Sequence, residues 1–388
     1  MPAIDTTTYP AFALNQNDIF ASLANMIISQ EVFADNLGKH QTLVDKARVD
    51  GGLYGDKKLY YATDVLKTHA WGADSEASNL LALDRPDAPS VQAITLDIFR
   101  QIRLTVDDYL TKRAWSTVDA FSTFNSVMLG WIRETKKVYD GTLYNTFIGT
   151  TETATGEQDR TIALSGTDDG QAIAQGIADL LVEMGDYSRD FNDYGYLRSY
   201  SSDAIKVIWN SKFVNKIRKV DTPTIFHREG LVDKLDEDVI PSRYFGTVIT
   251  TTNYSTYSDS TPAAGKPIDS DDGTYVPGSN NANGCLRSLV EQDVTVSAVV
   301  YHLFPGDELP AGAVVYASSE VKIPCYIEDA TVICKVVVKL PPYMSAFEVG
   351  TSFFNPRSLT ENHYLTFGHN TLQYLKNYPF VTVKKVSA

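Results

Sequence analysis

The clearest alternation of apolar and polar residues in this chain runs from Ile94 to Val106. Its apolar members are Ile94, Leu96, Ile98, Ile102, Leu104 and Val106. This period of two predicts a long β-strand with one buried face, broken only by Arg100. A shorter strand is predicted at Leu59 to Tyr61, and the polar, turn-rich stretch from Gly72 to Pro89 separates the two. Together they predict a long antiparallel hairpin, which is marginal alone in water and must lie on another surface.

Apolar residues at spacings of three and four predict the helices. The longest begins after Ser116, a capping residue, and is expected to end at Asp140 and Gly141. A second amphipathic helix is predicted over 169–184, and short helices over 17–27, 31–37 and 212–219. The N-terminal region lacks the large apolar residues that an independent domain needs, so we expect it to pack on something else.

The second half of the chain is predicted to be rich in β-strands. Residues 204–209 predict a buried strand, and Val239 to Pro241 predict the end of another. From Thr250 to Gly284 the sequence is mostly Ser, Thr, Asn, Asp, Gly and Pro, which predicts an exposed insertion with few groups to bury. Further strands are predicted over 294–303, 313–317, 331–340 and 380–386.

Length, composition and charge narrow the class of protein. A chain of 388 residues with 43% hydrophobic and 21% charged residues predicts a folded protein of about two domains. The formal net charge of −14 predicts a surface that repels nucleic acid and anionic membranes. The most cationic stretch is interpreted as a solvated face; its members are Lys39, His40, Lys46, Arg48, Lys57 and Lys58. The N-terminus lacks a signal-peptide pattern, and no run reaches the ~18 apolar residues of a membrane span, so we expect a soluble, cytoplasmic protein.

Candidate ligand motifs are weak. The three cysteines, Cys285, Cys325 and Cys334, are not spaced for zinc or a disulfide framework, which favours a reducing compartment and buried thiols at Cys325 and Cys334. Residues 165–170 lack the lysine of a phosphate loop and are better explained as a helix cap. Residues 269–273 resemble a calcium loop, but the glycine is one place early and Asn280 replaces the glutamate; a turn is favoured, and a cation near Asp269 to Asp272 is left open.

No catalytic constellation emerges. His363 and His369 do not form a His-Glu-x-x-His pair, and no nucleophile elbow occurs. Aromatic residues at Tyr194, Tyr196 and Tyr200 could stack on bases or sugars, but Arg189 and Arg198 are the only basic residues near them, which favours packing or a subunit contact. We therefore assign no catalytic, cofactor-binding or metal residues, and we predict that the chain is not an enzyme.

The order of the expected elements resembles the major capsid proteins of tailed bacteriophages. The family's outgoing loop strand is similar to Ile94 to Val106, and its spine helix to Ser116 to Gly141. The turn that follows the helix in the family is similar to Leu143-Tyr144-Asn145 and Gly149. Residues 169–184, 204–209 and 238–241 resemble its axial-domain helix and strands, and Tyr378 to Val383 resembles its terminal strand. The likeness covers most of the chain, but it is one of order and pattern.

The resemblance implies an α+β, HK97-like fold with an N-terminal arm, an extended β-hairpin loop, a long spine helix, an axial α/β domain and an inserted polar loop or subdomain. The implied divisions are an N-terminal arm (1–50), an extended hairpin loop (51–106), a spine helix and peripheral domain (107–165), the first part of the axial domain (166–249), an insertion or surface subdomain (250–325) and the return strands of both domains (326–388). The hairpin and the arm are expected to lay their apolar faces against other copies of the chain and not against their own subunit.

The implied function is a structural subunit that self-assembles as hexamers and pentamers into an icosahedral head around double-stranded DNA. Implied partners are a separate scaffolding protein, a portal, and packaged DNA held on the inner face without sequence-specific contacts; no membrane or cofactor is implied. The expected location is the virion, after assembly in the bacterial cytoplasm. Nothing matches a lysine–asparagine crosslinking pair, so no covalent crosslink is expected.

Two alternatives stay open. The 22 tyrosines and the many Asp and Glu residues suit a carbohydrate-binding or hydrolytic β-rich protein. No carboxylate pair can be placed at a catalytic separation from sequence, which weakens this reading. The other alternative is a different virion component, such as a tail or decoration protein.

Overall fold

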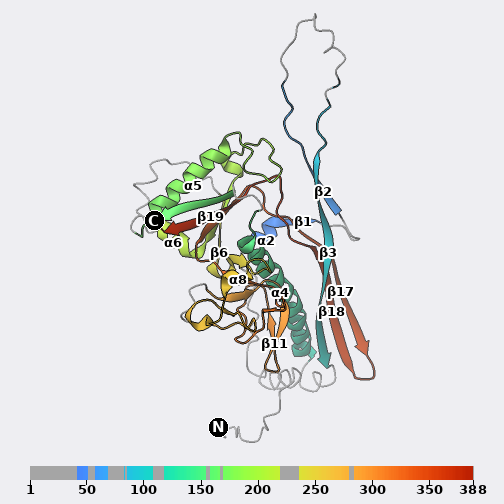
Figure 1. The fold of residues 1–388 in the computed structure, drawn as a ribbon. Helices are drawn as coiled ribbons and strands as arrows, with labels where there is room; N and C mark the ends of the chain where they lie inside the picture. Colours follow the sequence, from blue (N-terminus) through green and yellow to red (C-terminus); the bar gives the residue numbers. More distant parts are fainter. Residues whose placement is uncertain are drawn as a thin grey trace, which may run out of the picture.

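The structure is a computed structural model that describes residues 42–50, 57–68, 83, 85–107, 118–153, 158–166, 169–218, 236–278 and 284–387 (Figure 1). The described part is α+β, with two five-stranded sheets, a long helix and a small β-rich unit. The short helices expected over 17–27 and 31–37, and most of the hairpin tip from Gly72, lie outside the described residues.

The first sheet carries the hairpin and has the strand order β1-β17-β18-β3-β2. Its strands are β1 (Arg48–Asp50), β17 (Tyr343–Asn355), β18 (Thr360–Asn370), β3 (Ser90–Asp107) and β2 (Lys57–Ala62). The long strand and its antiparallel pairing with β2 are confirmed, but β2 covers only residues 90–95 of β3. The rest of β3 pairs with β18, and β18 pairs with β17. Sequence analysis missed both of these strands.

The long helix α4 (Val118–Thr150) packs across this sheet. Ile132 and Tyr139 of α4 contact Leu365 and Phe367 of β18 in one buried cluster, which Ile102 and Leu104 of β3 border. The expectation that the apolar face of the outgoing strand lies against other copies is therefore wrong for this stretch. The reason is that the helix of the same chain already covers it.

The predicted end of the helix at Asp140 and Gly141 is also wrong, because α4 continues to Thr150. Asp140 is fully buried and accepts hydrogen bonds from Arg48, Lys136 and Tyr343. A buried, paired carboxylate can stay inside a helix, so the Asp-Gly pair does not act as a stop signal here.

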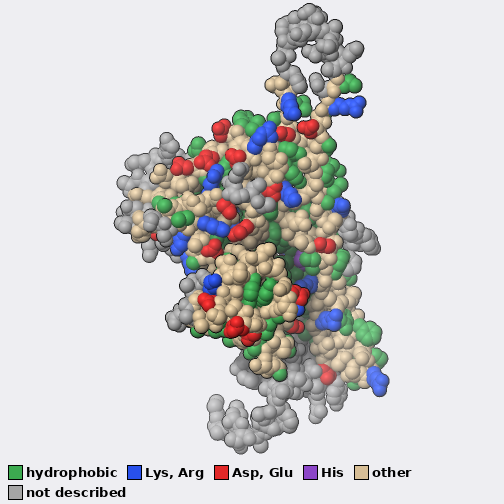
Figure 2. Space-filling model, in the orientation of Figure 1, with side chains coloured by type: hydrophobic (Ala, Val, Ile, Leu, Met, Phe, Trp, Pro, Cys, Tyr) green, Lys and Arg blue, Asp and Glu red, His purple; other side chains and the backbone are tan. Residues whose placement is uncertain are grey.

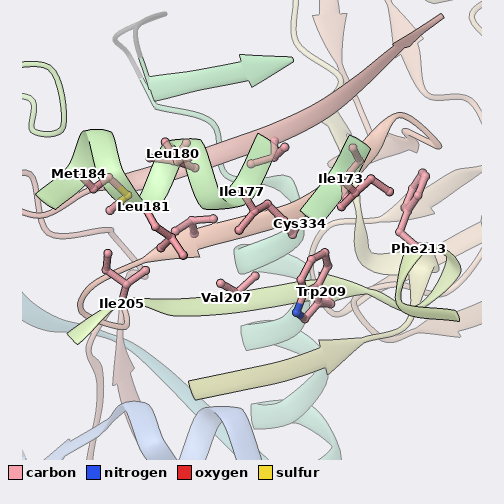
Figure 3. Close-up of a cluster of buried hydrophobic side chains, with 14 of the residues drawn as sticks. Ile173, Ile177, Leu180, Leu181, Met184, Ile205, Val207, Trp209, Phe213 and Cys334 are labelled. Carbon is pink, nitrogen blue, oxygen red and sulfur yellow. The ribbon is translucent and has the colours of Figure 1, made fainter. Parts of the chain in front are cut away.

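The second sheet has the order β4-β19-β16-β5-β6. Its strands are β4 (Asp159–Leu164), β19 (Phe380–Ser387), β16 (Val332–Val337), β5 (Lys206–Asn210) and β6 (Asp236–Ile240). Helices α5 (Asp169–Gly185) and α6 (Ser211–Arg218) cover one face, and the predicted apolar stripe of α5 points at β5 and β16 (Figure 3). The predictions for α5, α6, β5 and β19 are confirmed to within a few residues.

The other face of the second sheet is covered by α4 and α2 (Thr42–Ala47). Tyr144 and Ile148 of α4 share a buried cluster with Ile208 of β5 and with Leu43 and Val44 of α2. Alternate residues of β5 thus enter opposite cores, as the strand period of two requires. The last part of the expected bridging arm, residues 42–50, is docked on its own subunit, which corrects that expectation for these residues.

The polar stretch from Thr250 onward belongs to a β-rich unit with its own core. Its elements are β7 (Gly246–Val248), α8 (Tyr254–Tyr257), β8 (Ser258–Asp259), β9 (Ile268–Asp269), β10 (Leu286–Ser288), β11 (Gln292–Val296), β12 (Val299–Leu303), β13 (Tyr316–Ala317), β14 (Glu320–Val321) and β15 (Cys325–Glu328), with 3-10 turns at Ser242–Tyr244 and Pro262–Ala264 and, before the unit, at Ser202–Ala204. Tyr254, Ile268 and Tyr275 are buried there, so the expectation of few groups to bury is wrong. Aromatic and aliphatic side chains spaced between the turns, such as Tyr254, Ile268 and Tyr275, form this core.

Candidate assembly surface

The hairpin of β2 and β3 projects from the body of the molecule (Figure 1). Beyond β2, residues 63–68 and 85–89 continue the two arms without helix or strand structure. The hairpin carries exposed large apolar side chains, namely Leu59, Tyr61, Val65, Leu66, Leu83 and Val91. Leu66 and Leu83 keep 76% and 81% of their surface exposed. Several large apolar side chains exposed on one projection are typical of a site of protein–protein contact.

A second apolar strip lies on the face of the first sheet that points away from α4. Residues paired across adjacent strands share a face, so Phe99, Val349 and Phe353 lie opposite to the face that Ile102 and Leu365 bury. Phe99 and Phe353 are 56% and 62% exposed. Figure 2 shows hydrophobic side chains along the edge of the molecule that this sheet forms. One molecule thus offers apolar surface on a projection and on a sheet face.

The incoming arm of the hairpin is fixed at its base by ionic and main-chain contacts. Asp64 Oδ2 lies 2.7 Å from Arg189 Nη1, and the Leu197 N–H donates to Asp64 Oδ1 at 3.0 Å. Arg198 Nη2 donates to the Thr63 carbonyl oxygen at 2.6 Å. The Arg189 guanidinium and the Leu197 N–H lower the pKa of Asp64 to about 2. The carboxylate is therefore charged throughout the physiological pH range.

The outgoing arm is fixed at the same level. The Ser90 and Tyr196 hydroxyls are 2.6 Å apart. Gln92, which is buried, uses both ends of its amide: Nε2 donates to the Tyr374 carbonyl oxygen at 2.9 Å, and Oε1 accepts from the Lys376 N–H at 3.0 Å. Two loops, one after α5 and one between β18 and β19, therefore grip the hairpin from the body.

These contacts explain the tyrosine cluster singled out from the sequence. Tyr194 and Tyr196 lie with ring centroids 5.4 Å apart, and Tyr200 is buried with its hydroxyl donating to the Asn377 carbonyl oxygen. Arg189 and Arg198 bind the hairpin arm. The cluster packs within the subunit, as the packing interpretation expected.

A buried ionic centre joins the first sheet to α4. Asp140 Oδ2 lies 3.0 Å from both Arg48 Nη2 and Lys136 Nζ, and the Tyr343 hydroxyl donates to Asp140 Oδ1 at 2.6 Å. Burial and the neighbouring Asp140 carboxylate raise the pKa of Tyr343. Two cations and a hydroxyl compensate one carboxylate, so the charge is paired despite its burial.

His369 lies next to this centre as a structural group. Its Nδ1 donates to the Asn370 carbonyl oxygen at 2.9 Å, and its Nε2 accepts from the Tyr139 hydroxyl at 2.7 Å. Burial lowers the pKa of the imidazole. His363 lies on the same strand, six residues away, with Nε2 3.9 Å from Glu361 Oε1. The structure does not bring the two histidines into a metal pair.

The other candidate motifs also have structural roles. In the resembled calcium loop, Asp269 and Asp272 accept the N–H groups of Asp271 and Thr274, which is turn chemistry. Among the described residues, no group of three or more His, Cys, Asp and Glu side chains is placed to hold a metal ion. The Gly166 N–H donates to Asp169 Oδ1 at the start of α5.

Two of the three cysteines have the burial that the sequence predicts. Cys325 and Cys334 are buried, as expected, and Cys285 is half-buried. All three cysteines are free thiols. No helix in the described part of the chain is both long and apolar enough to span a membrane.

Lys335 of β16 is a buried cation that the sequence did not reveal. Its Nζ donates to the carbonyl oxygen of Thr151, just beyond the C-terminal end of α4, at 2.9 Å and to Thr382 Oγ1 at 2.8 Å. Burial lowers the pKa of Lys335 to about 8. A cation at this end of a helix also interacts favourably with the helix dipole.

We expect Lys335 to make the stability of the fold rise with pH. Between about pH 8 and the unfolded value near 10.5 the unfolded chain binds more protons than the folded one, so the free energy of unfolding gains up to about 3 kcal/mol. Chemical denaturation from pH 7 to 10.5 should show that the free energy of unfolding of wild type rises relative to that of Lys335→Met. Lys46→Met is the control: burial is outweighed by the neighbouring Asp238 and Asp236 carboxylates, which raise the pKa of Lys46, so its contribution is lost only as pH rises above 10.5. A pH-independent difference for Lys335→Met would contradict this role.

No protein-family model matches this sequence, and no curated protein sequence matches it. Among solved structures, a chain from the capsid of Staphylococcus phage Andhra matches with a TM-score of 0.61 and 10% identity, over 92% of this chain and 87% of that one. A chain from the structure of the head fibre and inner core protein gp22 of bacteriophage P68 matches with a TM-score of 0.59 and 8% identity, over the same shares. At such identities the likeness concerns the fold. The fold implied by the order of elements is confirmed: the chain has an α+β, HK97-like capsid fold.

Proposed function

We propose that this chain is the major capsid protein of a tailed bacteriophage, a structural subunit that assembles with copies of itself into an icosahedral head around double-stranded DNA. The observation that carries the proposal is the projecting hairpin, whose Leu66 and Leu83 side chains are left uncovered by their own subunit. The fold shared with a chain from a solved phage capsid supports it.

The two apolar surfaces account for assembly. The hairpin and the outer face of the first sheet are different surfaces, so contact between them is heterologous and builds rings or shells in place of a closed pair. Many modest contacts per subunit sum to a stable particle. In this mechanism the bridging part is the distal hairpin, because one face of the inner half of β3 and the apolar side chains of residues 43–47 pack against their own subunit.

The proposed divisions follow from the same reading. Residues 51–106 serve as the extended loop, and 107–165 as the spine and peripheral domain. Residues 166–249 and 326–388 supply the axial domain and the return strands, with 250–325 as an inserted surface subdomain. Residues 1–50 form the N-terminal arm, of which 42–50 is anchored within the subunit.

The proposed role is structural and not enzymatic. Hexamers and pentamers of the chain, a scaffolding protein and a portal are the proposed protein partners. A net charge of −14 suits loose, sequence-independent contact with packaged DNA on the inner face. Assembly in the bacterial cytoplasm and residence in the virion complete the proposal. No specific observation favours a carbohydrate-binding or hydrolytic role.

Electron microscopy of the purified protein tests this function. We expect capsomers or closed shells, with or without an added scaffolding protein, and light scattering that grows with protein concentration. A protein that stays monomeric under every condition would overturn the proposal. A tubular or fibrous particle would instead indicate a tail component.

A further inference from the structure

The contacts at the base of the hairpin have a geometric consequence. Beyond β2, residues 63–68 pair with no strand in the described part of the chain, so the contacts at their base hold this segment on the body. At about 3.3 Å per residue, the four residues from Asp64 to Thr68 reach at most about 13 Å beyond the contacts that hold Asp64. A rotation of about 15° at Asp64 would therefore move Thr68 by about 3 Å.

The base is gripped on both arms and by two separate loops. Asp64 and Thr63 are bound from the loop after α5, through Arg189, Leu197 and Arg198. Gln92 is bound from the loop before β19. Arg198 also joins the two loops, because its Nη2 lies 3.1 Å from Asn377 Oδ1. Together these contacts oppose rotation in more than one direction.

The contacts that hold Thr63, Asp64 and Gln92, here called the grip, affect the direction of the hairpin more than the stability of the subunit. The Asp64 and Arg189 side chains are 26% and 53% exposed, and an ion pair at such a site stabilises a fold only slightly. A second strand pair, β18 with β3, already holds the inner half of the hairpin in place. Losing the grip should therefore leave the subunit folded while the distal hairpin changes its orientation.

We propose that Asp64 and Gln92 are positioning residues that set the direction in which the hairpin leaves the subunit, and hence where it meets a second copy of the chain. The role of this direction in assembly rests on the proposed capsid function. The grip itself is a property of the single subunit and is measurable without any assembly.

Distances between two spin labels, measured by double electron–electron resonance, test the grip in the single subunit. Labels are placed at Thr68→Cys on the arm and Val182→Cys on α5, with Cys285→Ser removing the half-buried native thiol. We expect one narrow distance distribution, and in Asp64→Ala/Gln92→Ala a mean shifted by about 3 Å or more, or a broader distribution. Glu320→Ala, which breaks a surface pair with Lys322 elsewhere, is the control and should change neither.

Particle imaging of the unlabelled variants tests the consequence. We expect irregular or missing particles for Asp64→Ala/Gln92→Ala and uniform ones for wild type and Glu320→Ala. The double variant should stay folded, with a melting temperature lowered by the loss of the two Gln92 hydrogen bonds, and Glu320→Ala should melt like wild type. Should the double variant not fold, Asp64→Asn, which keeps the side-chain shape, replaces it in both measurements. The proposal is overturned if the double variant keeps the wild-type distance between the labels. It is also overturned if that distance changes but the particles look like those of wild type. A wild type that never assembles, yet shows the distance change on substitution, overturns the capsid function while the grip stands.

Discussion

Replacing Leu66 and Leu83 with glutamate is expected to abolish closed particles and to leave the free energy of unfolding of the subunit within about 0.5 kcal/mol of wild type. Both side chains are largely exposed in the subunit, so nothing in its core depends on them. In an assembled particle each would lose about 1.5–3 kcal/mol of burial and place a charge in an apolar contact. Since every 1.4 kcal/mol is about tenfold in affinity, two sites per subunit raise the concentration needed for assembly by orders of magnitude.

Light scattering and electron microscopy across a concentration series measure this effect, and thermal unfolding of the same samples reports on the subunit. Val182→Glu is the matched control, because Val182 is 73% exposed on α5, away from the hairpin. It should assemble like wild type. Normal particles from the Leu66→Glu/Leu83→Glu protein would remove the hairpin from the mechanism.

Replacing Asp140 with alanine should lower the free energy of unfolding by about 3–5 kcal/mol. The carboxylate is fully buried and is shared by Arg48, Lys136 and the Tyr343 hydroxyl. Removing it leaves Lys136, whose side chain is 7% exposed, with Glu348 at 3.6 Å as its remaining acidic partner among the described residues. The cost of a buried cation with one more distant, half-exposed partner adds to the loss of three hydrogen bonds.

Denaturant titration of the subunit measures this loss. Asp45→Ala provides the control, because Asp45 binds the same Arg48 at 2.9 Å but is 61% exposed. That variant should lose no more than about 1 kcal/mol. Equal losses for the two variants would show that Asp140 acts as an ordinary surface partner, contrary to its burial.

Sequence patterns predicted the elements whose burial is one-sided and regular. The alternation from Ile94 to Val106 located β3, and the spacing of Ile173, Ile177 and Leu181 located α5. Where apolar side chains are few on either face, the pattern fails. Strands β17 and β18 carry polar residues on both faces over much of their length, so no alternation marks them.

Long-range pairing explains most of the remaining errors. Asp140 and Gly141 stay helical because Arg48 and Tyr343, distant in sequence, satisfy the carboxylate. The grip on the hairpin depends on Asp64 and Gln92 meeting loops more than a hundred residues away. The tyrosines and arginines between 189 and 200 were visible as a cluster, but only the fold shows that the hairpin is what they hold.

Helix α4 enters two separate cores, one beneath the first sheet through Ile132 and Tyr139 and one beneath the second through Tyr144 and Ile148. The helix is therefore one rigid element that packs against both the first and the second sheet. If the chain has the proposed capsid role, tension on the hairpin from internal pressure would pass along this helix into the second sheet. The two halves of the subunit would then share the load and not turn about a hinge between them.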